Sequence, residues 1–342
     1  VHALGVSSTA TRQFSRHWGL YAYARYDRLT GDAGNNILTG WEGDDVIDGG
    51  KGSDMVVMRG ASTDFSLTWT VDGWKVADRR PFAPPSSAQT YEGVDTVRNV
   101  EWISFTDKTV ELGDGMTLVV GNILRNTGGA GGTLASDLSS RLESGALTPT
   151  TALVEIVKAA GATTSVATLA YEFFTGKIPG QPGVDYLVSP TGPNANNLNS
   201  AYYQSFNLEN RYINFAVNLG KLGEGKDAFL AKYGSLSFVE ATREAYKTIF
   251  GAAPTDAKIH AMIDTRVDYF AAYGGDGVNG IGTKAAMVGW LLAEAQKADL
   301  GVMVRSNDAW LTDLADGSAP FAIDILDPAK GYYKADFVFG GA

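Results

Sequence analysis

Oxygen-bearing side chains recur every nine residues near the start of the chain, at Asn36, Asp45 and Asp54. Each is the sixth residue of a nine-residue segment that begins with glycine and ends with a short, mainly apolar run; the three segments are 31–39, 40–48 and 49–57. Glycine allows tight turns, and carboxylate, amide and carbonyl oxygens are the ligands that calcium prefers. The spacing therefore predicts three turns that offer oxygens to calcium, each followed by a short strand.

These segments resemble the repeats of RTX (repeats-in-toxin) proteins, with the pattern G-G-x-G-x-D-x-U-x, where U is a large apolar residue. The resemblance implies Ca2+ as the cofactor, turns that alternate between two sides of a β-roll, and one ion between turn i and turn i+2. By that rule Asn36 and Asp54 share one side and Asp45 lies on the other. The eighth residues, which point into a thin core, are Leu38, Ile47 and Val56. The candidate calcium ligands are Gly31, Ala33, Asn36, Gly40, Glu42, Asp45, Gly49, Lys51 and Asp54.

The first two repeats depart from the pattern at three residues. The first has Asp32 at position two and Asn36 at position six, and the second has Trp41 at position two. A Gly/Asp-rich loop is the alternative, and three consecutive in-register repeats argue against it. Because a solenoid needs at least about three repeats to be stable, we expect flanking segments to help hold a roll that binds one or two ions.

Residues 58–113 are predicted to form an antiparallel β cap. Apolar and polar residues alternate over 65–70, as in a half-buried strand, and Asp72-Gly73 indicates a hairpin. The run 93–105 resembles the segment that follows RTX turns. Two acidic residues in this run are interpreted as structural, Asp95 and Glu101.

The other boundaries follow from composition and resemblance. Residues 1–28, with a strand at 18–25, are a β segment that is either a fusion remnant or a cap, because 21–33 resemble the closing strand of an outer-membrane scaffold barrel of the MltA-interacting type. Residues 114–148 are predicted to be a Gly-containing linker with a flexible hinge at 128–132. Residues 315–342 are a C-terminal tail and a candidate secretion signal.

Residues 149–314 carry apolar residues at helical spacing. The predicted helices lie within 167–174, 198–219, 238–250, 257–273 and 284–298. Together these patterns predict an α+β multidomain fold: a short calcium-binding parallel β-roll with an antiparallel β cap, followed by an all-α helical domain.

The segments 163–176, 184–188, 197–206 and 209–219 resemble the N-terminal helical domain of caulobacter-type surface-layer (S-layer) proteins. The resemblance implies attachment to a cell-surface polysaccharide, the O-polysaccharide of lipopolysaccharide. Aromatic faces stack on sugar rings, and Asn and Arg contact hydroxyls, so the candidate sugar-binding residues are Tyr202, Tyr203, Asn210 and Arg211. The alternative is that these residues are helical core and solvated surface. The rival function is a calcium-triggered structural subunit, a homo-oligomer that forms a sheet or filament.

Composition and missing motifs argue against several classes of function. The 342 residues carry a net charge of −10 and no cysteine, which argues against a nucleic-acid partner and excludes disulfides and thiolate chemistry. Histidines occur only at His2, His17 and His260, and no H-E-x-x-H, G-x-S-x-G or P-loop motif is present, so no enzyme is predicted. No apolar run reaches the roughly 18 residues of a membrane span. We expect an extracellular protein at the cell surface, exported by a type I system.

Overall fold

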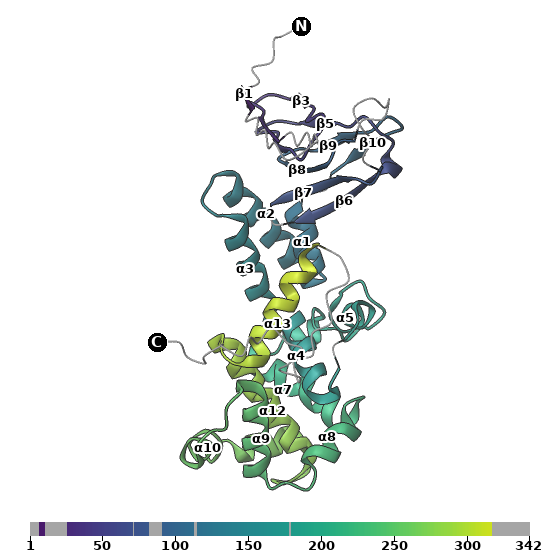
Figure 1. The fold of residues 1–342 in the computed structure, drawn as a ribbon. Coiled ribbons are helices and arrows are strands. Elements are labelled where there is room, and N and C mark those ends of the chain that lie inside the picture. Colours follow the sequence, from purple (N-terminus) through teal and green to yellow (C-terminus); the bar gives the residue numbers. More distant parts are fainter. Residues whose placement is uncertain are drawn as a thin grey trace, which may run out of the picture. The chain divides into compact units, whose positions relative to one another are not determined.

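The computed structural model describes residues 7–10, 26–70, 72–81, 91–112, 115–177 and 179–316, and divides the chain into two compact units. The first unit contains residues 1–119, 135–150 and 315–317, and the second contains 120–134, 151–314 and 318–342. Strands occupy the described part of the chain up to residue 111 and helices follow (Figure 1). The predicted α+β fold class is confirmed.

The nine-residue repeats form a two-sheet roll. Its strands are β2 (Asp27–Thr30), β3 (Ile37–Leu38), β4 (Val46–Asp48) and β5 (Met55–Val57). Successive strands alternate between sheets: β4 pairs in parallel with β2, and β5 pairs in parallel with β3. Side chains alternate across a strand, so the eighth residue of each repeat faces the space between the sheets. Leu38, Ile47 and Val56 are at most 2% exposed, as the repeat pattern predicts.

The cap adds strands to both sheets of the roll. A hairpin of β6 (Phe65–Thr70) and β7 (Gly73–Asp78) follows the short helix η1 (Ser62–Asp64), as Asp72-Gly73 predicts. Beyond it, β8 (Val94–Arg98) pairs in parallel with β4, and β9 (Trp102–Ser104) pairs in parallel with β5. The sheets are completed by β1 (Ser7–Ala10) beside β2 and β10 (Thr109–Glu111) beside β9. The segment after the repeats therefore extends the roll as well as capping it.

The prediction of a linker at 114–148 was wrong, because two helices fill most of it. They are α1 (Gly115–Leu124) and α2 (Gly129–Glu143). Apolar residues at helical spacing in α1 are all buried: Met116, Val119, Val120, Ile123 and Leu124. Burial of such a stripe outweighs the roughly 1 kcal/mol that each glycine costs a helix.

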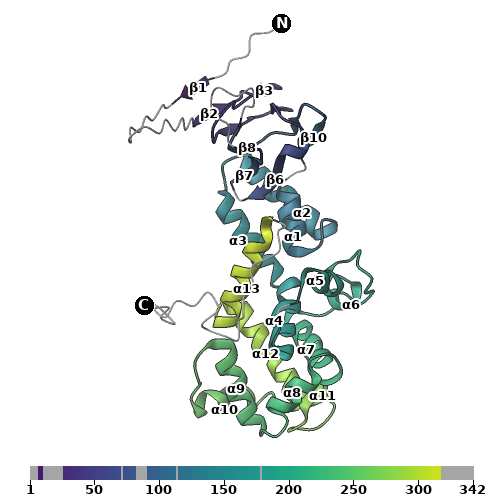
Figure 2. The ribbon, with the colours of Figure 1, turned by 45° about the vertical axis from the view of Figure 1, so that its right-hand side comes forward.

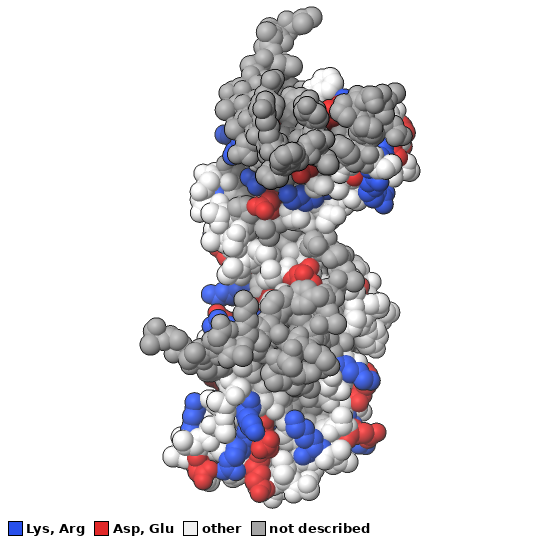
Figure 3. All heavy atoms as spheres, in the orientation of Figure 1, with Lys and Arg blue, Asp and Glu red and all other residues white. Residues whose placement is uncertain are grey.

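The second unit is helical. After α3 (Pro149–Ala160), its elements are α4 (Thr164–Thr175), α5 (Gln181–Val188), α6 (Ala201–Gln204), α7 (Leu208–Val217), the π-helical turn η2 (Asn218–Leu222), α8 (Lys226–Tyr233), α9 (Phe238–Phe250), α10 (Asp256–Ile263), α11 (Val267–Gly274), α12 (Ile281–Ala298), α13 (Val302–Asp313) and the 3-10 turn η3 (Leu314–Asp316). Helix α12 is buried along most of its length and lies against α7, α9 and α11 (Figures 1 and 2). On the face drawn in Figure 3, acidic and basic side chains are interspersed over this unit.

Two predicted helices are interrupted. The one expected at 198–219 breaks between α6 and α7, where the Asn207 side chain accepts a hydrogen bond from the Asn210 amide at 2.8 Å and starts a new helix. The one expected at 257–273 breaks at Asp264, between α10 and α11. Helical spacing continues across both breaks, so the apolar pattern does not reveal them.

Some predictions lie outside the described residues. These are the strand expected at 18–25 and most of the tail at 315–342. In the part of the chain that the structure describes, no single helix is long and apolar enough to span a membrane. By length and composition alone, the bent pair 150–160 and 164–175, with 62° between its helices, passes that test.

Candidate calcium site

The turns of the roll stack in two columns, one on each side. The turn 49–54 lies on the turn 31–36, where the amide of Lys51 donates to the carbonyl of Asp32 at 3.1 Å and the amide of Ser53 donates to Asn35 Oδ1 at 3.0 Å. The turn 40–45 belongs to the other column. Asn36 and Asp54 therefore share one side and Asp45 lies on the other, as the alternation predicts.

The sixth-position side chains are linked through the backbone. Asp54 Oδ1 accepts a hydrogen bond from the amide of Asn36 at 2.6 Å. Asp45 Oδ1 accepts in the same way from the amide of Asp27 at 2.7 Å. The cap continues both columns, because Glu101 accepts from the amide of Asp54 at 2.6 Å and Asp95 accepts from the amide of Asp45 at 2.9 Å. All these carboxylates thus receive a backbone donor from the neighbouring strand.

Asp54 keeps one oxygen for another partner. Its side chain is fully buried, and Oδ2 has no hydrogen-bond donor among the described residues. This oxygen points into its own turn, since a Cβ placed on Gly49 would lie 2.6 Å from it. Burial raises the pKa of Asp54, although the hydrogen bond from Asn36 opposes the shift. A buried carboxylate oxygen inside a glycine turn is a donor that suits Ca2+.

The donor set fits calcium only if backbone carbonyls take part. Within the described residues, no group of three or more His, Cys, Asp or Glu side chains could hold a metal. Of the predicted ligands at position three, Ala33 and Lys51 can offer only a carbonyl oxygen, and both side chains are exposed. Glu42 Oε1 lies 3.6 Å from Arg59 Nη2, so its carboxylate is paired with a cation. In the first turn, Asn36 Nδ2 donates to Asp32 Oδ1 at 3.0 Å, which fixes the amide with its oxygen toward Gly31.

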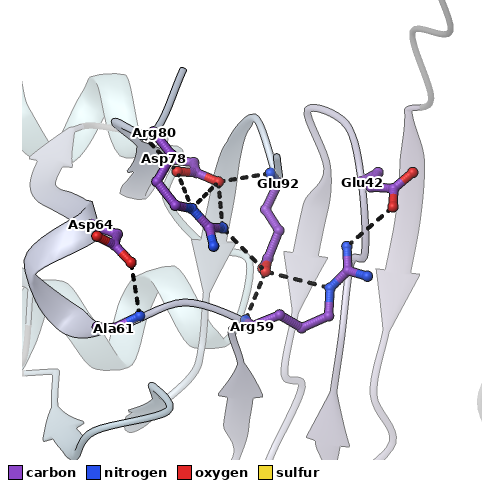
Figure 4. Close-up of polar contacts among 7 residues, drawn as sticks. All are labelled: Glu42, Arg59, Ala61, Asp64, Asp78, Arg80 and Glu92. Carbon is purple, nitrogen blue, oxygen red and sulfur yellow. Dashed lines mark hydrogen bonds and ion pairs between the residues drawn. The ribbon is translucent and has the colours of Figure 1, made fainter. Parts of the chain in front are cut away.

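An ion-pair network joins the turn 40–45 to the cap (Figure 4). Arg59 donates from its amide to Glu92 Oε1 at 2.7 Å, and its Nε lies 3.4 Å from the same oxygen. Arg80 pairs with Asp78 at 2.6 Å. The Arg59 guanidinium also lies 4.9 Å from the ring of Trp41. The network fastens residue 92 beside the repeats.

Three acidic residues of this region were not among the predicted ligands: Asp27, Asp95 and Glu101. Hydrogen bonds align Asp27 and Asp95 with Asp45 in one column, and Glu101 with Asp54 in the other. Asp95 is 1% exposed, and burial raises its pKa to about 8, with the nearby Asp45 and Glu92 adding to the shift. The signal that could have found it is the match of Gly93 and Asp95 to positions four and six of a repeat.

The predicted sugar-binding residues separate into two pairs. Tyr202 is 49% exposed, and Asn210 accepts a hydrogen bond from the exposed Tyr269 hydroxyl. Tyr203 is buried against Phe206 and Phe215. Arg211 is also buried, with Nη1 donating to the carbonyl of Ala162 at 2.6 Å. The structure therefore gives Tyr203 the core role that was the alternative. It buries Arg211, for which the alternative was a solvated pair with Glu209, and Glu209 instead pairs with Arg266 and Lys297.

Comparison with known families agrees with both regions. Residues 27–56 match the RTX calcium-binding nonapeptide repeat (4 copies), and residues 163–335 match the RsaA N-terminal domain. No curated protein matches the chain. Both families are structural, and together they indicate a secreted, S-layer-like protein of the cell surface whose repeats bind Ca2+. Because the second match covers more than half of the 342 residues, the chain belongs to the RsaA N-terminal domain family.

Proposed function

We propose that the protein attaches to a cell-surface polysaccharide through its helical unit, while calcium rigidifies the roll. The ligands in the first column are the side chains of Asn36 and Asp54 with carbonyls of turns 31–36 and 49–54. The orphan oxygen of Asp54 is the observation that supports this assignment. Export by a type I system belongs to the same proposal. It predicts that removal of residues 315–342 abolishes secretion.

The sugar-binding surface that we propose is built from α6, α7, the start of η2 and α11. Its residues, here called the Tyr–Asn surface, are Tyr202, Asn210, Asn214, Asn218 and Tyr269. Asn214 donates to the Tyr202 hydroxyl at 3.3 Å, and Asn218 donates to Asn214 at 3.0 Å. Exposed tyrosine rings beside amide groups combine a stacking face with hydrogen-bonding groups, which is the chemistry that a pyranose needs.

Attachment is testable with the full chain in calcium. We expect it to bind cells that carry O-polysaccharide and not isogenic cells that lack it. Tyr202→Ala and Tyr269→Ala should each weaken binding by about 10-fold, because a lost aromatic contact costs about 1 kcal/mol or more. Tyr186→Ala is the matched control, since Tyr186 is also 49% exposed but lies on α5.

Two outcomes would overturn attachment. One is equal binding to both kinds of cell. The other is absence of binding together with ordered assemblies on calcium addition without cells, which would favour the structural-subunit alternative.

A further inference from the structure

The cap contains a segment that reads like another repeat. Residues 91–98, Tyr-Glu-Gly-Val-Asp-Thr-Val-Arg, follow residues 41–48, Trp-Glu-Gly-Asp-Asp-Val-Ile-Asp, position by position. Both have an aromatic residue, then Glu and Gly, then Asp at position six and an apolar residue at position eight. The β6–β7 hairpin lies between this segment and the third repeat, so the nine-residue period along the sequence is lost.

The backbone places this segment as the repeat pattern requires. Strand β8 pairs with β4 so that Thr96 faces Val46 and Val97 faces Ile47, which is position seven on seven and eight on eight. Val97 is fully buried in the core of the roll, as Ile47 is. Gly93, at position four, has a positive φ of 82°, like Gly43 at 123°.

The two columns make the same contacts. In one, the amide of Ser53 donates to Asn35 Oδ1 at 3.0 Å; in the other, the amide of Val94 donates to Asp44 Oδ1 at 2.8 Å. The sixth-position amides of Asn36 and Asp45 donate to the carboxylates of Asp54 and Asp95. At position four, a Cβ on Gly52 would meet the carbonyl of Gly34, and a Cβ on Gly93 would meet the carbonyl of Gly43. The turn 91–95 therefore stacks on 40–45 as 49–54 stacks on 31–36.

Asp95 is buried in this second column. Its side chain is 1% exposed and accepts a hydrogen bond from the amide of Asp45 at 2.9 Å. Among the residues that the structure describes, no Lys or Arg forms an ion pair with it. Its neighbours Asp44 and Asp45 are carboxylates. Glu92, in contrast, is neutralised by Arg59 and Arg80.

We propose that residues 91–98 are a displaced repeat and that the turns 40–45 and 91–95 hold a calcium ion of their own, with the Asp45 and Asp95 carboxylates as side-chain ligands. This inference rests on calcium binding by the repeats but assigns a site that residues 31–57 alone cannot form. Each column then carries one ion.

Calcium stoichiometry tests the site in the full chain. The wild type should bind two ions by calorimetry, Asp95→Asn should lose one, and Asp54→Asn should lose the other. Glu111→Gln, an exposed charge change in the same unit, should lose neither. A wild type that takes up no calcium would defeat the proposed function itself. Uptake that Asp95→Asn leaves unchanged in number and affinity would overturn only this inference.

Terbium luminescence provides a second test with variants that should fold. Trp41 belongs to the turn 40–45 and is 52% exposed, whereas Trp102 donates to Ser53 in the turn 49–54 at 3.3 Å. Energy transfer to a bound lanthanide falls steeply with distance, so each tryptophan reports on its own column. Trp41→Phe should remove a clear part of the sensitised Tb3+ emission, and Trp102→Phe another part. Emission that ignores Trp41→Phe and is lost in Trp102→Phe would contradict an ion in the second column.

Discussion

In the helical unit two buried cations are held by backbone carbonyls, whereas in the roll buried carboxylates are held by backbone amides. Lys284 is 1% exposed and donates to the carbonyls of Tyr233 and Gly234 at 2.9 and 3.1 Å, at the C-terminal end of α8. Arg211 donates to Ala162 just beyond α3. The C-terminal ends of helices have spare carbonyls and negative partial charge, so both cations have backbone acceptors within the unit.

The roll differs because Asp54 and Asp95 receive one amide each and no cation from a described residue. A buried anion that is only half satisfied opposes folding. The two buried cations of the helical unit therefore have their counter-groups in the protein, whereas we expect the roll to depend on a counter-ion from solution. The stability of the roll should therefore depend on calcium concentration, whereas the stability of the helical unit should depend on its own packing and charges.

Removal of calcium should have the largest effect, and it should be confined to the roll. Ligand binding stabilises a fold by about 4 kcal/mol when the free ligand is about 1,000 times its Kd, which is comparable to the whole stability of a small domain. We expect two thermal transitions in calcium and loss of the β transition in EGTA, followed by calorimetry and circular dichroism. Magnesium at equal concentration is the control. Simultaneous loss of both transitions in EGTA would show that calcium stabilises the helical unit as well as the roll.

A substitution in the core of the helical unit should destabilise that unit and leave the roll unaffected. Phe229 is 2% exposed and lies 4.7 Å, between ring centroids, from both Phe174 and Tyr233. Phe229→Ala should lower the free energy of unfolding of the helical unit by about 3–5 kcal/mol and leave calcium affinity unchanged. Leu222→Ala, at a side chain 71% exposed, is the control. A change in calcium affinity in Phe229→Ala would show that the units are coupled.

In the helical unit, Asp308 should make stability depend on pH. Burial raises the pKa of Asp308 to about 7, and the nearby Asp299 adds to the shift. An unfolded aspartate titrates near about 3.9, so between these values the folded state holds more protons and stability falls as pH rises. Asp308→Asn should flatten this decline between about pH 4 and 7 in urea unfolding. Asp268→Asn, on exposed α11 surface, should retain it; an equal decline in Asp308→Asn would refute the assignment.

The smallest effect is expected at a helix cap. Ser237 Oγ accepts from the amide of Glu240 at 3.3 Å, and Glu240 accepts from the amide of Ser237 at 2.8 Å. Ser237→Ala should lower the free energy of unfolding of the helical unit by about 1 kcal/mol without changing calcium affinity. Ser235→Ala, in the preceding turn, should change neither quantity. Equal effects of the two variants would argue against the cap.

The roll was predictable because its residues repeat every nine positions along the sequence. Position-eight residues every nine positions placed Leu38, Ile47 and Val56 in the core, and alternation of turns placed Asp45 opposite Asp54. The role of Asp95 was not predictable from period alone. The inserted hairpin breaks the spacing, and only strand pairing brings β8 beside β4.

In the helical unit, spacing identified helices better than it identified exposed faces. Helix α9 was predicted with its observed bounds, whereas α1 and α2 were missed because glycine was given more weight than the apolar stripe. The neighbours Tyr202 and Tyr203 have the same chemistry, but Phe215 covers one and solvent the other. That difference depends on tertiary packing that no local pattern contains.

The position of β8 and β9 has a consequence for how the roll folds. Repeat arrays usually nucleate anywhere and grow by adding neighbours, but here β8 and β9, the partners of β4 and β5, come only after the β6–β7 hairpin. Until they are in place, β4 and β5 present open edges that could pair with another chain. Closure across the hairpin also requires non-local contacts, which slow folding. A nascent roll should therefore remain unstructured until residue 104 is available and then form in one cooperative step.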